Sequence, residues 1–274
     1  MGSELRTDGR WQHTFRQSFL GSFAMCPEKA RHDYYGLSEH RHNDATALGT
    51  AFHAAAEYAC YELRDTPTAP TTDLMVEVAH QELATIGDWD TVRLTRTQMD
   101  DALPIMCDGW IAEIMPAVEP LDMEYTFHVP LYEDDERVIA LSGTMDCVAA
   151  DGIVWDWKTS SSLRGYTSDA WEKRRWAVQP TVYLYAHSVE GGPGAELDQL
   201  TFRYAAIDYT GKTATLDIVR HDGHVRWLTD QTLRIARLIE SDVPTWPLND
   251  AGWHCSPKWC DLWADCKGAH IEAW

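Results

Sequence analysis

Three charged side chains, Asp146, Asp156 and Lys158, stand between apolar residues in the segment 141–161, LSGTMDCVAADGIVWDWKTSS. The apolar neighbours predict a buried β-hairpin, in which a charge costs several kcal/mol unless it is paired or binds metal. Two acids on one face would suit Mg²⁺ or Mn²⁺, because these ions prefer hard oxygen ligands. An aspartate–lysine ion pair on a solvated face is the alternative interpretation.

The register of this hairpin decides whether the two acids can meet. With a two-residue turn at residues 151–152, Asp156 would lie opposite Cys147, and the acids would point to opposite faces. With a three-residue loop, Gly152 takes the left-handed position of a G1 bulge, and Asp146 lies directly opposite Asp156. Their Cβ atoms would be about 5 Å apart, with Lys158 on the same face. We expect the three-residue loop, with a divalent cation between the like charges.

Helices and strands alternate around this hairpin. Hydrophobic periodicity predicts helices over 13–35, 46–64, 72–86, 95–117 (where Pro104 can kink or split the helix), 178–190 and 223–241. Strands are expected over 123–132, 137–150 and 153–159, and a second hairpin over 199–209 and 213–220. This order predicts an α/β fold with a mixed sheet, a helical N-terminal part and a loop-like C-terminal tail.

Composition fits a globular chain of 274 residues, of which 45% are hydrophobic. There is no apolar run long enough for a membrane span and no visible signal peptide, so we expect a cytoplasmic protein without a membrane partner. The net charge of −20 disfavours a general nucleic-acid surface, so any such site must be local. The dense basic run Lys173, Arg174 and Arg175, beside Trp171 and Trp176, is the candidate, with a solvated loop as the alternative.

Several motifs occur in an order that resembles one nuclease family. The segments GTMD and WDWKTS, which contain Asp146, Asp156 and Lys158, resemble motifs II and III of the PD-(D/E)xK nuclease superfamily. The segment LGTAFHAAAE resembles its upstream helical motif, and QPTVY resembles the Q-x-x-x-Y motif of RecB-type nucleases. These segments contribute His53, Gln179 and Tyr183, and Glu124 in MEYTF resembles an acid often found on the preceding strand.

The resemblance implies a restriction-endonuclease-like fold, a mixed sheet flanked by helices, and phosphodiester hydrolysis of DNA. It implies an Mg²⁺- or Mn²⁺-dependent deoxyribonuclease, an exonuclease acting on single-stranded DNA or DNA ends. The metal ligands would be His53, Asp146, Asp156 and the Trp157 carbonyl, and Lys158 would position the attacking water. Gln179 and Tyr183 would contact DNA or orient the lysine. The basic run with Trp176 would bind single-stranded DNA.

Seven cysteines, an odd number, argue against a disulfide framework. The spacing Cys255-x4-Cys260-x5-Cys266 suggests a metal site, and SFLGSFAMCPEKARHDYYG resembles the N-terminal helix of iron–sulfur RecB-type nucleases, such as AddB and the CRISPR-associated exonucleases. By resemblance, a 4Fe-4S cluster would be held by Cys26, Cys255, Cys260 and Cys266. The usual pair spacing is two residues rather than four. Structural zinc, which four thiolates also suit, is the alternative. His254 adjoins Cys255 and could be a ligand, but four cysteines make it unnecessary. The other cysteines, Cys60, Cys107 and Cys147, are expected in the core.

The resemblance covers most of the chain and implies one RecB-like nuclease domain over 1–274. Within it we expect a helical part at 13–120 carrying Cys26 and His53, a PD-(D/E)xK core at 121–243, and a cysteine tail at 244–274. The expected setting is a bacterium or a phage-infected host, with recombination or CRISPR-adaptation proteins as partners. The rival functions are a catalytically silent DNA-binding or assembly subunit and a redox-sensing iron–sulfur protein.

Overall fold

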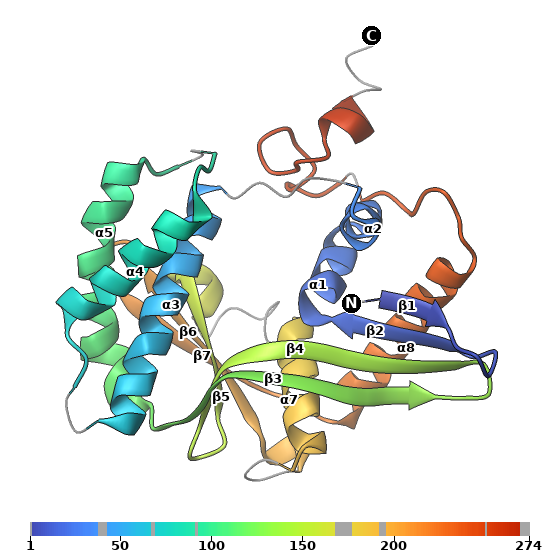
Figure 1. Ribbon diagram of the computed structural model, residues 1–274, viewed down its shortest axis with the longest axis horizontal. Coiled ribbons are helices and arrows are strands. Elements are labelled where there is room, and N and C mark those ends of the chain that lie inside the picture. Colours follow the sequence, from blue (N-terminus) through green and yellow to red (C-terminus); the bar gives the residue numbers. More distant parts are fainter. Residues whose placement is uncertain are drawn as a thin grey trace. The chain divides into compact units, whose positions relative to one another are not determined.

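The computed structural model describes residues 2–37, 43–66, 69–90, 93–167, 177–191, 196–249 and 251–268 (Figure 1). The chain forms two compact units. Unit 1 comprises residues 1–41, 128–143 and 226–274, and unit 2 comprises residues 42–127 and 144–225. None of the helices in the described ranges is both long enough and apolar enough to cross a membrane.

Unit 2 begins with three helices that lie side by side (Figure 1). They are α3 (Asp44–Asp65), α4 (Thr72–Ile86) and α5 (Arg96–Gly109). Each helix is capped at its N-terminus by a side chain that accepts a hydrogen bond from a backbone N–H of the first turn. The capping residues are Asn43, Thr71 and Thr95, respectively. These helices confirm the expected ones, except that α5 continues through Pro104. It ends at Gly109, where a π-helical turn (Trp110–Ile114) and a 3-10 turn (Met115–Ala117) follow.

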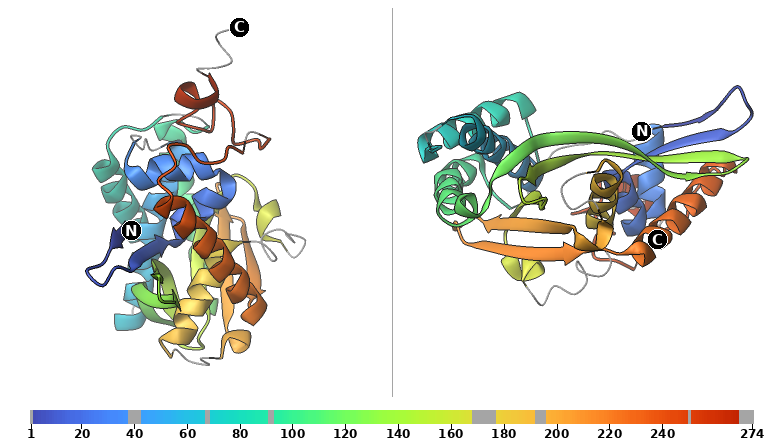
Figure 2. Two further views of the ribbon diagram at one scale, coloured as in Figure 1. Left: turned by 90° about the vertical axis from the view of Figure 1, so that its right-hand side faces the viewer. Right: turned by 90° about the horizontal axis from the view of Figure 1, so that it is seen from below.

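Unit 2 also contains the mixed sheet that the sequence predicts. The strands are β3 (Pro120–Glu133), β4 (Arg137–Ala149), β5 (Val154–Ser160), β6 (Thr201–Asp208) and β7 (Thr213–Val219), and β3 and β4 begin or end in unit 1. β5 is antiparallel to β4 and parallel to β6. β7 is antiparallel to β6, and these two strands are the orange arrows of Figure 2. Short 3-10 turns (Leu163–Tyr166 and Leu197–Gln199) and helix α7 (Val178–Val189) connect β5 to β6.

One face of this sheet packs against α3. The helix buries Ala51, Ala55 and Ala59 completely, in a core shared with Trp155 and Trp157 of β5. Small side chains on the helix leave room for the large indoles, and burying each large side chain contributes about 1.5–3 kcal/mol. Cys60, Cys107 and Cys147 also lie in this core, as expected. The packing fixes α3, and therefore His53, relative to β5.

Unit 1 contains β1 (Gly2–Leu5), β2 (Trp11–Arg16), α1 (Gln17–Met25), α2 (Pro27–Tyr35), most of α8 (Asp222–Glu240) and the C-terminal tail with a short π-helical turn (Ala264–Gly268). The prediction of one helix over 13–35 is wrong in two places. Residues 13–16 belong to β2, which pairs in parallel with β4 through partners more than a hundred residues away. The remaining helix is split at Cys26, because Pro27 begins α2 and cannot donate a backbone hydrogen bond.

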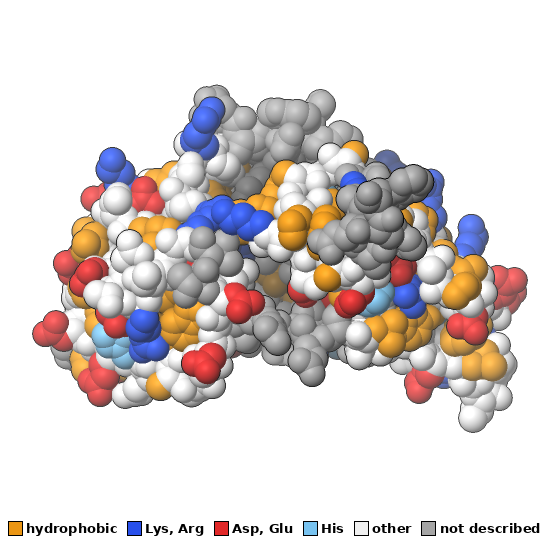
Figure 3. Space-filling view, turned by 90° about the horizontal axis from the view of Figure 1, so that it is seen from above, with side chains coloured by type: hydrophobic (Ala, Val, Ile, Leu, Met, Phe, Trp, Pro, Cys, Tyr) orange, Lys and Arg blue, Asp and Glu red, His pale blue; other side chains and the backbone are white. Residues whose placement is uncertain are grey.

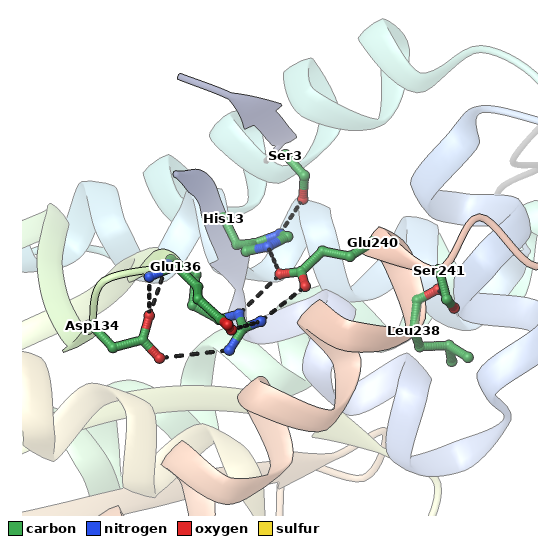
Figure 4. A network of polar contacts seen from close by, with 8 residues as sticks. Ser3, His13, Asp134, Glu136, Leu238, Glu240 and Ser241 are labelled. Carbon is green, nitrogen blue, oxygen red and sulfur yellow. Dashed lines mark hydrogen bonds and ion pairs between the residues drawn. The ribbon is translucent and has the colours of Figure 1, made fainter. Parts of the chain in front are cut away.

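A polar network ties α8 to the strands of unit 1 (Figure 4). Glu240 accepts hydrogen bonds from His13 Nε2 at 2.9 Å and from both Nε and Nη2 of Arg137 at 3.1 Å, while Ser3 Oγ lies 2.6 Å from His13 Nδ1. Burial lowers the pKa of His13. Burial alone would raise the pKa of Glu240, but the bonds from Arg137 and His13 outweigh it and lower that pKa. The network therefore favours neutral histidine and ionised glutamate.

Charges of both signs share the molecular surface. On the face drawn in Figure 3, acidic side chains (red) lie interspersed with lysine and arginine side chains (blue). On this face, the net charge of −20 is therefore not spread as a uniform layer of acidic side chains.

Candidate active site

The β4–β5 hairpin has the register that the three-residue loop predicts. Cys147 pairs with Trp155 and Val148 with Val154, and Gly152 has a φ of 83°. Continued by one pair, this register sets Asp146 opposite Asp156. The backbone ladder itself stops at Cys147, and the N–H of Trp157 instead donates to Asp146 Oδ2 at 2.8 Å. The strands thus separate where the acids begin.

The predicted catalytic side chains meet at this point in unit 2. His53 Nδ1 of α3 lies 3.3 Å from Asp146 Oδ2. Lys158 Nζ forms a close ion pair with Asp156 Oδ2, and Asp156 is only 1% exposed. The structure brings together His53, Asp146, Asp156 and Lys158, as the sequence predicts.

The electrostatics of the site reflect crowded carboxylates. Burial, and then the charge of Asp156, raise the pKa of Asp146. Burial alone would lower the pKa of Lys158, but the attraction of Asp156 and Asp146 outweighs it and raises that pKa. Lys158 is therefore a fixed positive charge that partly offsets the two acids.

Glu124 of β3 extends the acidic cluster. Its backbone has a φ of 47°, in the left-handed region that non-glycine residues rarely adopt, and such strain is common at functional sites. The side chain is exposed, yet desolvation by the protein around it, followed by the charges of Asp146 and Glu57, raises its pKa to about 7. This places Glu124 within electrostatic reach of Asp146, where its resemblance to a family acid would put it.

Gln179 and Tyr183 occupy the first turns of α7, beside the same acids. Gln179 Nε2 donates to Asp156 Oδ1 at 2.6 Å, and Tyr204 OH donates to Gln179 Oε1 at 3.3 Å. Tyr183 is 5% exposed and stacks edge-on against Phe127, so its side chain is part of the support rather than the surface. Gln179 is thus positioned to orient an acid of the site.

Arg220 was not singled out from the sequence. It is 2% exposed and ties the end of β7 to the start of α7, because Nε donates to Thr181 Oγ1 at 2.8 Å and Nη2 to the Ala177 carbonyl at 3.2 Å. These two acceptors flank Gln179 in sequence. The sequence signal was faint: a single arginine after an apolar strand, whose partners lie some forty residues earlier.

The donor set suits a hard divalent cation. Among the described residues, no three histidine, cysteine or acidic side chains converge closely enough to hold a metal ion as they lie. However, Glu124, Asp146 and Asp156 crowd together, and Asp156 is already held by Lys158 and Gln179. A cation would offset both the burial and the repulsion from Asp156 that raise the pKa of Asp146, so the chemistry of the residues fits it. The residues from Trp171 to Trp176, with the predicted DNA contacts Lys173, Arg174 and Arg175, lie outside the described residues.

A second candidate site lies in unit 1. Four half-exposed cysteines, Cys26, Cys255, Cys260 and Cys266, line one cavity of about 430 Å³. Burial, then the nearby Cys26 and Cys255, raise the pKa of Cys266. Polar contacts join the tail to the N-terminal helices here: Lys29 Nζ to Asp261 at 2.6 Å, and the Trp246 N–H to Glu28 at 2.6 Å. The structure thus gathers the four predicted thiols around one space.

Comparisons with known proteins agree with this geometry. A family model described as the PD-(D/E)XK nuclease superfamily matches residues 15–267. The crystal structure of a protein named "Putative exonuclease" from Eubacterium rectale is similar in fold, with a TM-score of 0.55, 13% identity, and coverage of 89% of this chain and 87% of that one. The crystal structure of SSO0001 was also found, with 13% identity over 91% of this chain and 94% of that one, and its TM-score of 0.34 is too low to indicate a shared fold. No curated protein matches the chain significantly.

Proposed function

Because the chain belongs to the PD-(D/E)XK nuclease superfamily, we propose that it is a metal-dependent deoxyribonuclease, an exonuclease acting on single-stranded DNA or DNA ends. The observation that carries this proposal is the meeting of Lys158 with Asp156, in a hairpin whose register sets Asp156 opposite Asp146. A silent nuclease fold would have no need to keep this acid–acid–lysine set, nor would a redox sensor.

The residues of the site would have two kinds of role, metal binding and orientation of the attacking water. His53, Asp146, Asp156 and the Trp157 carbonyl would hold Mg²⁺ or Mn²⁺, with Glu124 as an additional acid. When bound, the ion would lower the pKa of a water and offset charge on the phosphate. Lys158 would orient that water through Nζ and stabilise the charge that develops on the phosphoryl oxygens.

Gln179 would act through Asp156, whose carboxylate its amide orients. Tyr183 would support the same helix turn from its buried position. For the lysine–arginine run at 173–175 and Trp176, stacking on and steering single-stranded DNA remains the prediction from the sequence.

A 4Fe-4S cluster held by Cys26, Cys255, Cys260 and Cys266 is the second part of the proposal. Support comes from the placement of all four thiols around one cavity of about 430 Å³. Structural zinc is the alternative. In either case the metal would join α1 and α2 to the tail of unit 1, adding to the folding energy of that unit.

The proposed setting is the cytoplasm of a bacterium or of a phage-infected host, with recombination or CRISPR-adaptation proteins as partners. One assay separates the candidate functions. EDTA should stop cleavage of end-labelled DNA while the cluster remains bound. A silent subunit would bind DNA without cutting it, and a redox sensor would do neither.

A further inference from the structure

A pocket with two cationic side chains lies on unit 2, outside the cluster of acids. It has a volume of about 560 Å³ and is lined by Leu163, Arg164, Thr167, Asp208 and Lys212. The first three residues belong to or adjoin the 3-10 turn after β5, and the last two flank the β6–β7 hairpin turn. Two loops at the same end of the sheet therefore build the pocket.

The positive charges of this pocket are available to a ligand. Arg164 and Lys212 are exposed, and neither forms an ion pair with an acid within the described ranges. Asp208 is the acid of the pocket, but its Oδ1 already accepts the backbone N–H groups of Thr210 and Lys212 and the Thr210 hydroxyl. Its carboxylate thus caps the hairpin turn, and the charge of Lys212 is one of the causes that lower the pKa of Asp208. The two cations outnumber this one acid in the lining of the pocket.

A third cation, Arg93, lies next to the same turn. Its Nη1 donates to Ser161 Oγ at 2.8 Å, and Ser161 precedes the 3-10 turn. Its backbone is fixed independently, because the N–H groups of Arg93 and Leu94 both donate to Asp44 Oδ2. The contact with the Ser161 hydroxyl holds the guanidinium of Arg93 beside the 3-10 turn.

The three cations lie around the end of the strand that carries Lys158. β5 continues from Asp156 through Lys158 to its last residue, Ser160, and Ser160 pairs with Asp208 of the pocket. Two residues of extended chain span about 7 Å, a short step along a nucleic-acid backbone. We propose that Arg93, Arg164 and Lys212 form a surface that binds the sugar–phosphate backbone of the DNA substrate as it leads to Lys158.

This inference rests on the proposed nuclease function and adds a site to it. A chain of net charge −20 repels DNA at long range, so productive binding needs a local positive surface near the active site. Contacts to phosphate position a substrate without reading its sequence. Each cation that neutralises a phosphate also adds about 0.7 to the salt slope of single-strand binding, which gives the surface a measurable signature.

The test measures binding of a fluorescently labelled dT20 oligonucleotide to the full chain by anisotropy, in EDTA and at about 50 to 300 mM salt. Arg164→Gln and Lys212→Gln should each weaken binding and reduce the magnitude of the salt slope by about 0.7, and the double variant by about 1.4. Arg93→Gln should behave like either single variant. A labelled dA20 should show the same losses.

The control is Arg64→Gln, which changes an arginine that is ion-paired with Asp65. Arg64 is also exposed, but it lies near the opposite end of α3 from Asp44, about 30 Å along the helix, and should not alter binding. A double variant with the wild-type affinity and slope would overturn the proposal, as would an equal loss in the control. Binding in EDTA does not depend on catalysis, so a wild-type protein that fails to cut DNA with Mn²⁺ would refute the nuclease function alone.

Discussion

Gln179 Nε2 donates a hydrogen bond of 2.6 Å to Asp156 Oδ1, from the first turn of α7 to the middle of β5. The amide is itself held, because Tyr204 OH donates to its oxygen and Arg220 secures the turn that carries it. The orientation of the most deeply buried acid of the site therefore depends on a glutamine twenty-three residues later in the chain.

Gln179→Ala should slow DNA cleavage about 10- to 100-fold. A hydrogen bond to a charged group is worth about 1.5–3 kcal/mol, and each 1.36 kcal/mol corresponds to a factor of ten in rate. The loss should fall on kcat, measured with end-labelled DNA and Mn²⁺. Gln81→Ala is the control, since Gln81 is exposed on α4 and bonds only to nearby Glu77. Wild-type kcat in the Gln179 variant would show that the contact has no catalytic role.

The β4–β5 hairpin could be predicted because its determinants are local. Gly152 at positive φ sets the loop length, and loop length sets the register that aligns Asp146 with Asp156. Helix α3 was equally predictable from its apolar spacing.

Other features depend on long-range pairing. Residues 11–16 form a strand because β4 lies beside them. His13 and Phe15, two residues apart, are both buried, which is the alternation of a strand. The bond from Gln179 to Asp156 and the strained φ of Glu124 likewise follow from tertiary packing, and no local pattern specifies either.

The network of His13 and Glu240 predicts that acid destabilises unit 1. Both folded-state pKa values lie below their ordinary values of 6.5 and 4.5, so the unfolded chain binds more protons in each window. Stability is therefore present above each ordinary value and is lost as the pH falls through it towards the folded value. The melting temperature, followed from pH 7.5 to about 4, should report this loss.

His13→Phe isolates the histidine contribution. Phenylalanine keeps a ring between Trp11 and Phe15 but removes the titrating group. The raised pKa of Glu124 in unit 2 acts with the opposite sign, so the difference between variant and wild type is the quantity to measure. The variant should lose less stability than the wild type as the pH falls below 6.5. Parallel pH profiles would contradict the assignment.

Gly109 lies so close to the backbone of Gly211 that a methyl group added at Gly109 should lower stability. A Cβ on Gly109 would overlap the Gly211 carbonyl oxygen and lie 2.9 Å from its carbonyl carbon. Gly109→Ala should therefore destabilise the protein by about 1–3 kcal/mol in urea denaturation. Gly49→Ala is the matched change in α3, where Cβ would meet Thr159 Oγ1 at 3.3 Å and better helix propensity offsets the crowding. Equal stabilities for the two variants would refute this account of the contact.

The proposed iron–sulfur cluster predicts that the purified protein is coloured. Purified without oxygen, the chain should be brown and carry about four irons, as expected for a thiolate-held cluster. Cys26→Ala or Cys260→Ala should remove the colour and lower the melting temperature, because the cluster would join α1 and α2 to the tail. Cys107→Ala, in the core of unit 2, should keep the colour even if it lowers stability. Colourless protein with one zinc would favour the alternative metal.

We propose that Asp156 belongs to a metal-dependent catalytic site, and two substitutions within one hairpin test this role. Asp156→Asn should reduce Mn²⁺-dependent cleavage of end-labelled DNA by about 10³-fold, since charge stabilisation by a bound ion is worth several kcal/mol. Asp151→Asn changes an exposed acid whose carboxylate only caps the turn through the Ile153 N–H, and it should leave the rate unchanged. Cleavage at the wild-type rate by a folded Asp156→Asn protein would show that Asp156 has no catalytic role.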